Sequence, residues 1–228
     1  MTDLSVSSPP FPEPGLLSNG QYRVAVSVAG SGRSEWRAYA LTRYTADLTR
    51  DAEGWFFYLR DLDSHQVWSA GHQPVQRSPL RYEARWEASC VTIEREDERI
   101  ETRMEIRVDP LHDLEWRSVT LTNRGGTPRR LELTSYVEVA LNTPAADAGH
   151  PAFSKLFLQT EFLPGLEALL VCRRPRSPEE PALALGHALR PEVPDGTAVE
   201  YETDRARFIG RGRTLVAPRA LDPSIRLS

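Results

Sequence analysis

The chain has 228 residues, of which 40% are hydrophobic, so it is long enough to bury one large β-sheet core. A formal net charge of −4 argues against bulk electrostatic capture of nucleic acid. Since no stretch reaches the roughly 18 apolar residues of a membrane helix, and since Cys90 and Cys172 show neither metal nor disulfide spacing, we expect a cytoplasmic protein with no membrane segment in this chain.

The chain opens with a lead-in rich in proline and serine, residues 1–15, which we expect to be disordered because proline removes backbone donors and fixes φ. From residue 16 to residue 228 we expect one β domain. It starts with a turn at Asn19-Gly20 and a strand at Tyr22–Val28, in which alternate valines share one face.

The clearest strand is Ile100–Val108, in which apolar and charged residues alternate with the period of two that sends one set into a core. Leu114–Thr122 and Leu131–Leu141 follow with similar patterns and short polar turns between them. Consecutive antiparallel strands of this kind predict an all-β fold of two large packed sheets. Further strands are expected at Trp55–Arg60, Gln66–Ser69, Tyr82–Ala88, Val91–Arg95, Leu156–Phe162, Ala168–Arg173, Ala182–Leu189 and Ala198–Thr203. Convincing helical periodicity is absent, and the region after Arg211 lacks a finished terminal element, so we expect a truncated C-terminus.

Several catalytic patterns fail when they are tested against the sequence. Gly30-Ser31-Gly32 follows a strand, but Glu35 replaces the third glycine of a dinucleotide fingerprint. The five histidines form no close pair suited to zinc. Asp61 and Asp63 could serve as paired carboxylates for glycoside chemistry, but we interpret them as solvated turn carboxylates. We therefore assign no catalytic residue and no metal ligand.

Several separated motifs follow one another along the chain. They are Leu17-Ser18-Asn19-Gly20, Trp36-Arg37, Leu41-Thr42-Arg43-Tyr44, Val67-Trp68-Ser69-Ala70-Gly71-His72-Gln73-Pro74, His150-Pro151-Ala152-Phe153-Ser154-Lys155-Leu156-Phe157 and Tyr201-Glu202-Thr203-Asp204-Arg205-Ala206-Arg207-Phe208. In this order they resemble the N-terminal β-supersandwich domain of glycoside hydrolase family 94, formerly glycosyltransferase family 36. The resemblance is closest to the phosphorylase-like region of cyclic β-1,2-glucan synthases, and it covers nearly everything from Leu17 to Arg219.

The resemblance implies a two-layer, galactose-mutarotase-like supersandwich that precedes an (α/α)6 barrel carrying the catalytic acid. It implies no cofactor, with inorganic phosphate as the co-substrate that attacks the sugar. The implied partners are this barrel, in the same or a neighbouring chain, a β-glucan oligosaccharide, and a second copy in a homodimer. It also implies that the parent synthase is tethered to the inner membrane.

Two segments are candidates for carbohydrate binding. His150, Phe153 and Lys155 form a compact cluster in which Phe153 could stack on a pyranose while the two basic residues bond hydroxyls or an anion. Trp36 and Arg43 combine an aromatic ring with a guanidinium, which suits sugar stacking and hydroxyl recognition. Both segments equally suit contacts with a protein partner, for which aromatic residues and arginine are also typical.

We therefore expect a non-catalytic, carbohydrate-associated domain of a family 94 phosphorylase or cyclic glucan synthase, inactive alone because the resemblance places the catalytic acid in the barrel. Two alternatives remain open. A stand-alone aldose epimerase of the mutarotase kind would need a general acid and base, commonly His and Glu, in one cleft. A purely structural docking or dimerisation scaffold would never contact sugar.

Overall fold

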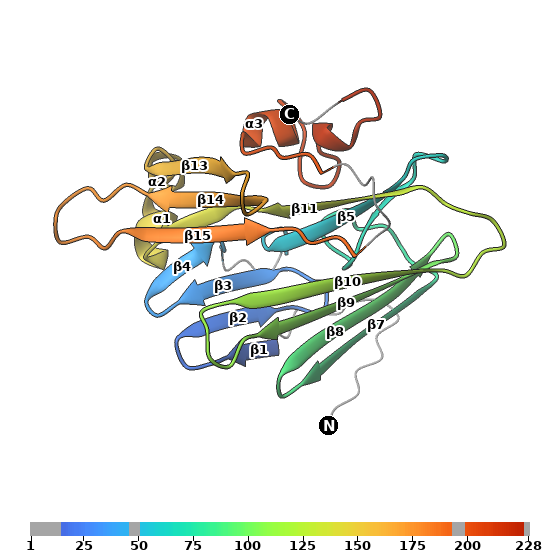
Figure 1. The fold of residues 1–228 in the computed structure, drawn as a ribbon, viewed down its shortest axis with the longest axis horizontal. Coiled ribbons are helices and arrows are strands. Elements are labelled where there is room, and N and C mark those ends of the chain that lie inside the picture. The colour runs from blue at the N-terminus through green and yellow to red at the C-terminus, as the bar shows by residue number, and fades with distance from the viewer. Residues whose placement is uncertain (1–14, 46–50, 193–198, 226–228) are drawn as a thin grey trace. The chain divides into compact units, whose positions relative to one another are not determined.

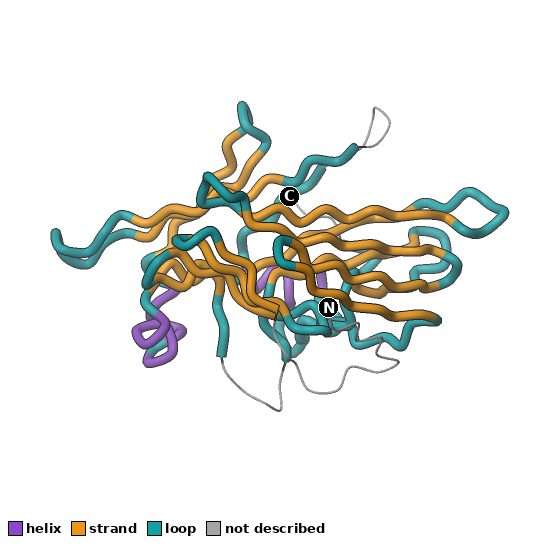
Figure 2. The backbone as a smooth tube through the Cα atoms, turned by 90° about the horizontal axis from the view of Figure 1, so that it is seen from below, coloured by secondary structure: helices purple, strands orange, loops and turns teal. Residues whose placement is uncertain are grey.

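The computed structural model describes residues 15–45, 51–192 and 199–225. It contains two compact units, Met1–Glu138 and Val139–Ser228 (Figure 1). Strands dominate both units and the helices are short, as Figure 2 shows, so the predicted all-β fold is confirmed. Apart from Gly15, which begins a strand, the predicted lead-in 1–15 lies outside the described residues. The single domain expected over residues 16–228 stays a prediction.

The first unit contains three antiparallel sheets with the strand orders β1-β2-β3-β4, β10-β9-β8-β7 and β11-β5-β6. The bounds of its strands are β1 (Gly15–Ser18), β2 (Tyr22–Val26), β3 (Gly32–Trp36), β4 (Tyr39–Thr42), β5 (Trp55–Asp61), β6 (Val67–Ser69), β7 (Arg81–Glu87), β8 (Cys90–Asp97), β9 (Ile100–Val108), β10 (Glu115–Asn123) and β11 (Leu131–Val137).

Alternation along β9 explains how two of these sheets pack on each other. Ile100, Met104 and Ile106 on its inner face are buried, and β1 and β2 contact this strand. Val24 and Val26 of β2 are also buried. Each such side chain contributes roughly 1.5–3 kcal/mol through removal from water, so this interface forms the core of the unit.

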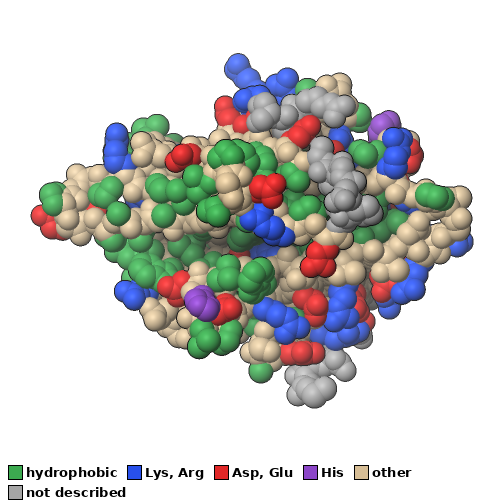
Figure 3. Space-filling model, in the orientation of Figure 1, with side chains coloured by type: hydrophobic (Ala, Val, Ile, Leu, Met, Phe, Trp, Pro, Cys, Tyr) green, Lys and Arg blue, Asp and Glu red, His purple; other side chains and the backbone are tan. Residues whose placement is uncertain are grey.

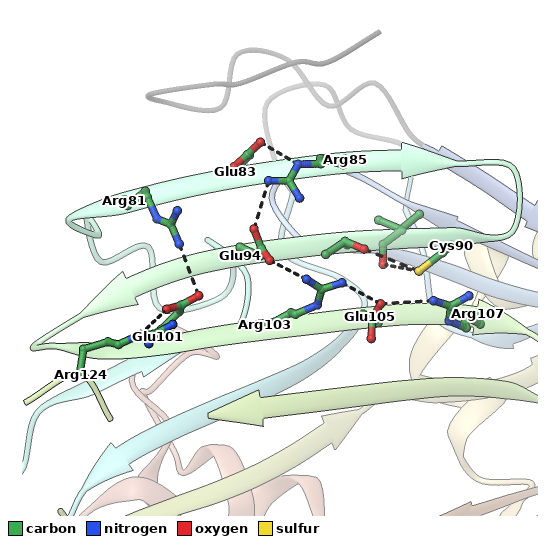
Figure 4. A network of polar contacts seen from close by, with 12 residues as sticks. Arg81, Glu83, Arg85, Cys90, Glu94, Glu101, Arg103, Glu105, Arg107 and Arg124 are labelled. Atoms are coloured by element: carbon green, nitrogen blue, oxygen red, sulfur yellow. Dashed lines mark hydrogen bonds and ion pairs between the residues drawn. The ribbon is translucent and has the colours of Figure 1, made fainter. Parts of the chain in front are cut away.

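The opposite face of the sheet β10-β9-β8-β7 carries a network of ion pairs (Figure 4). Arg103 of β9 bonds Glu94 of β8 at 2.9 Å and Glu105 of its own strand at 3.1 Å. In Figure 3, basic and acidic side chains mix at the lower right, where Figure 1 draws β7, β8 and β9. One buried and one charged face is the arrangement that antiparallel sheets adopt when one side meets water.

The second unit contains a sheet with the order β13-β14-β15. Its elements are β12 (Val139–Asn142), α1 (Pro144–Gly149), α2 (Pro151–Lys155), β13 (Leu158–Leu163), β14 (Ala168–Arg173), β15 (Leu183–Ala188), α3 (Arg205–Ile209) and the 3-10 turn η1 (Arg219–Leu221).

Most predicted strands are confirmed, and Ile100–Val108 and Ala168–Arg173 have the predicted bounds. The strand predicted over Leu131–Leu141 is interrupted at Glu138, whose backbone oxygen accepts a hydrogen bond from Arg43 N at 2.8 Å. The segment 32–42 was left without strands because its glycines and serines resemble a loop, but it forms β3 and β4.

The prediction of a strand at Ala198–Thr203 was wrong for its described part, because residues 199–203 form none. They lead instead into α3, where the side chain of Asp204 accepts hydrogen bonds from the N–H groups of Ala206 and Arg207. This is an ordinary helix N-cap, a signal that the sequence carried and the strand interpretation overlooked.

The interpretation of Asp61 as a solvated turn carboxylate was also wrong. Its side chain is fully buried at the end of β5, where Oδ1 accepts hydrogen bonds from the backbone N–H groups of Asp63 and Ser64, each at 2.8 Å. Arg129 donates to the other carboxylate oxygen from Nε at 2.6 Å. Asp63, by contrast, is exposed and pairs with Arg130. Asp61 is therefore a structural anchor of the turn after β5.

Candidate carbohydrate-contact residues

Trp36 ends β3, and its ring has three partners inside the first unit. Its Nε1 donates a hydrogen bond to Asp113 Oδ2 at 2.6 Å. The Tyr39 ring stacks beside it with centroids 6.3 Å apart, and the Arg37 guanidinium carbon lies 4.4 Å from the Trp36 ring centroid. These contacts join the β3–β4 turn to the β9–β10 turn, so sugar stacking on Trp36 would compete with Arg37 and Tyr39.

The β9–β10 turn that receives Trp36 is held by hydrogen bonds of its own. Asn19 Nδ2 donates to the backbone oxygens of Asp109 and His112, both at 2.9 Å. The Asp109 carboxylate accepts from the N–H groups of Leu111 and His112 at 2.9 and 2.8 Å. Hydrogen bonds from Leu111 and then His112 lower the pKa of Asp109. The turn is thus fixed from both sides.

We expect Trp36→Phe to destabilise the first unit by about 1 kcal/mol, because it keeps a ring but removes the indole hydrogen bond to the Asp113 carboxylate. Urea unfolding followed by fluorescence measures this loss. Asp113→Asn, which keeps an acceptor for the indole, is the matched control and should cost less. Equal losses in the two variants would contradict the expected role of the hydrogen bond.

Arg43 follows β4 and is almost completely buried. Its Nη1 bonds Glu138 Oε1 at 2.7 Å, and the Tyr136 hydroxyl lies 3.4 Å from Glu138 Oε2. A guanidinium held in this way stabilises the chain around the break between β11 and β12. Recognition of a sugar hydroxyl by Arg43 stays a prediction, and it would require access to a largely covered group.

The segment that contains His150, Phe153 and Lys155 was expected to be a loop or the entry to a strand, but it is helical. Thr143 caps α1 by accepting a hydrogen bond from Ala146 N at 3.4 Å, and a proline occupies the start of each helix. Proline fits there because the first helical N–H groups lack intrahelical partners. The strand predicted from residue 156 therefore begins only at Leu158.

Ser154 is the buried residue of α2 and anchors it to the second unit. Asn142 Nδ2 donates to Ser154 Oγ at 3.1 Å, and Arg173 Nη1 donates to Ser154 O at 3.2 Å. Burial, and next the charge of Arg176, lowers the pKa of Arg173. Sequence reasoning chose the aromatic and basic residues of this segment and missed the serine, which a search for polar residues between exposed positions could have found.

Three of the predicted contact residues belong to α2 or its start. His150 is exposed, Phe153 is 54% exposed and Lys155 is half-buried. Phe153 packs edge-on against Phe157, with ring centroids 5.2 Å apart. Pro151, Ala152, Phe153 and Leu156 together form an exposed apolar surface, called here the α2 ridge. It can stack on a sugar or dock a protein.

The remaining described residues add little to the list of candidate sites. Across the described ranges, no group of three or more His, Cys, Asp and Glu side chains is arranged to hold a metal ion. Among the helices in that part of the chain, none is long and apolar enough to cross a membrane. Trp36 and Arg43 belong to the first unit, and His150, Phe153 and Lys155 belong to the second.

The sequence matches the family described as "Glycosyl hydrolase 94, supersandwich domain" over residues 4–228. Over 213 residues it is 36% identical to the cyclic beta-(1,2)-glucan synthase NdvB of Rhizobium meliloti (strain 1021), covering 93% of this chain and 8% of that protein. It is 32% identical over 117 residues to the 3-O-beta-D-glucopyranosyl-beta-D-glucuronide phosphorylase of Paenibacillus borealis, covering 51% of this chain and 14% of that protein. An N,N'-diacetylchitobiose phosphorylase of Vibrio proteolyticus is 26% identical over 162 residues, with coverage of 69% and 20%.

Proposed function

We propose the function of this chain from one premise: it belongs to the glycosyl hydrolase 94 supersandwich-domain family. Its proposed role is that of a non-catalytic, carbohydrate-associated domain that supports and borders the active site of an (α/α)6 catalytic barrel. The observation that carries the proposal is the coverage of the relatives. The chain spans 8%, 14% and 20% of their lengths, so most of each whole enzyme lies outside the matched domain.

The relatives also indicate a class of substrate for the enzyme that this domain would serve. Their names specify a β-1,2-glucan, a β-glucosyl glucuronide and a diacetylchitobiose. We propose a β-glucan oligosaccharide as the saccharide, inorganic phosphate as the co-substrate, and no cofactor. Phosphate is itself an anionic nucleophile, so the domain would not have to supply a carboxylate base to activate water.

The α2 ridge supports a docking role for this domain. Phe153 and Leu156 expose 54% and 71% of their surface, while Ser154 between them is held by Asn142 and Arg173. An apolar surface on a fixed helix can bind a partner without an additional cost of ordering the helix. We propose that the catalytic barrel covers the ridge, which would place His150 and Lys155 at the border of the active site.

Phe153→Ser combined with Leu156→Ser is expected to change the stability of the isolated chain by less than about 0.5 kcal/mol, because both side chains are exposed. The same double variant should weaken association with the catalytic region of the Rhizobium meliloti synthase about tenfold, a loss of about 1.4 kcal/mol. Thermal unfolding by circular dichroism and titration calorimetry measure the two effects. Ser154→Ala is the control, with the opposite result: lower stability. Unchanged association of the double variant would contradict the docking role.

The proposed function is tested by comparing the chain alone with a chimera. In the chimera, this chain replaces the 36% identical segment of the Rhizobium meliloti synthase. We expect sugar phosphate to be released from β-1,2-gluco-oligosaccharides and inorganic phosphate by the chimera and not by the chain alone. Turnover by the chain alone would overturn the proposal. Interconversion of glucose or galactose anomers, lost on replacement of a single His or Glu, would establish the aldose epimerase alternative.

A further inference from the structure

The five tryptophans of the chain differ in what surrounds their rings. Trp68 is fully buried, and the indole nitrogen of Trp86 is buried as well. Trp55 bonds a serine through Nε1 and lies beneath an arginine, and Trp36 has the three partners described above. Trp116 is 55% exposed. Within the part of the chain that the structure describes, no ring stack or cation–π contact involves it.

Trp116 stands on the outer face of the sheet β10-β9-β8-β7. Its neighbour Glu115 points inward, where it accepts a hydrogen bond from Ser34 Oγ at 2.8 Å, so Trp116 points outward by strand alternation. Nine registered pairs between β9 and β10 fix this part of the sheet. The outward residues around the ring are Ser118 and Thr120 on β10, and Arg107, Glu105 and Arg103 opposite them on β9. The indole thus lies on a flat, rigid surface of hydroxyls and paired charges.

The charges of this face are balanced between the two signs. Arg107 bonds Glu105 at 3.2 Å and Arg103 bonds the same carboxylate at 3.1 Å, and Figure 4 shows the network continuing across β8 and β7. Guanidiniums neutralised in this way offer little attraction to a polyanion such as a nucleic acid. A protein covering the face would have to desolvate many charged groups, which costs several kcal/mol per ion unless each is matched. A neutral ligand with hydroxyl groups avoids both costs.

We propose that the outer face of β9 and β10 around Trp116 binds a neutral β-glucan chain. The apolar face of one pyranose stacks on the exposed indole, and hydroxyls of the next sugars bond Ser118, Thr120 and the half-exposed Arg107. Alternate residues along a strand lie about 6.8 Å apart, so the row from Trp116 to Thr120 accommodates a short oligosaccharide. This inference rests on the proposed carbohydrate association of the domain and adds a surface that the family resemblance did not indicate.

Titration of the isolated chain with a β-1,2-gluco-oligosaccharide tests the proposal, read out on the five indole N–H signals of a ¹H–¹⁵N NMR spectrum. We expect the Trp116 signal to move with a dissociation constant in the millimolar range, as a flat and open surface would give. Trp116→Ala should weaken binding about tenfold, while Trp116→Tyr, which keeps an aromatic ring, should stay within about threefold of the original. Mannitol, a polyol without a ring face, should produce no shift.

Leu111→Ala is the matched control, because Leu111 is another exposed apolar residue of the same turn region but lies outside the sheet face. It should leave the titration unchanged. A shift limited to the Trp36 signal, or no shift of Trp116 at the highest sugar concentration, would overturn the proposal. An active chimera with a silent Trp116 would overturn this surface alone, whereas an inactive chimera with a responsive Trp116 would overturn the proposed function and leave the surface standing.

Discussion

Replacement of Asp97 by alanine is expected to destabilise the first unit by about 3–5 kcal/mol, because it leaves a buried arginine without its counter-charge. Arg95 is completely buried. Its Nε and Nη2 donate to the two carboxylate oxygens of Asp97 at 2.6 and 2.8 Å. Its remaining hydrogen bonds reach the backbone oxygens of Gly71 and Arg77. One ion pair therefore holds β8 to the loop after β6.

Urea unfolding followed by tryptophan fluorescence measures this loss, since all five tryptophans lie in the first unit. Asp97→Asn keeps the shape and serves if the alanine variant does not fold. Arg95→Met combined with Asp97→Ala removes both charges and should lose at least about 2 kcal/mol less than the two single variants together. Asp63→Ala, at an exposed ion pair, is the surface control and should leave the midpoint unchanged. A loss below about 1 kcal/mol for Asp97→Ala would show that the pair is not the anchor inferred here.

The same pair marks a limit of what the sequence can predict about the fold. Alternation identified Val91 and Ile93 as one face of a strand, and both are buried. Arg95 and Asp97 continue that face, yet hydropathy assigns them to water. Their burial depends on carbonyl groups of Gly71 and Arg77, which only the folded chain brings within hydrogen-bond distance. Sequence patterns predict the strands well here because the strands are local, and they fail for buried charges because the partners are not.

The candidate site shows the same division between local and non-local information. Composition pointed to Phe153 and Lys155, but the position of that segment depends on Ser154 and its bonds to Asn142 and Arg173. For Trp36 the decisive partner is Asp113, which lies 77 residues away in the sequence. Short motifs therefore indicated which segments to inspect, whereas the direction of each side chain required the register of strands that are distant in sequence.

Asp61→Asn is expected to cost about 2 kcal/mol at neutral pH and to lose most of that cost in acid. Burial alone would raise the pKa of Asp61, but hydrogen bonds from Ser64 N–H, from the Arg129 guanidinium and from Asp63 N–H outweigh it and hold the pKa at about 2. Because this pKa is lower in the folded chain than the ordinary value of 3.8, the ionised carboxylate stabilises the fold above about pH 4. That contribution disappears as the pH falls through the folded value of about 2.

The measurement is the difference in unfolding free energy between the original chain and the Asn variant, from urea titrations at several pH values between 7 and about 2. Taking the difference cancels the other carboxylates that titrate over the same range. Asp63→Asn controls for the loss of a neighbouring exposed charge, and its difference should be close to zero throughout. A cost for Asp61→Asn that stays constant with pH would show that shape and not charge fixes the turn, because a neutral amide would then replace the carboxylate equally well or badly in both states of protonation.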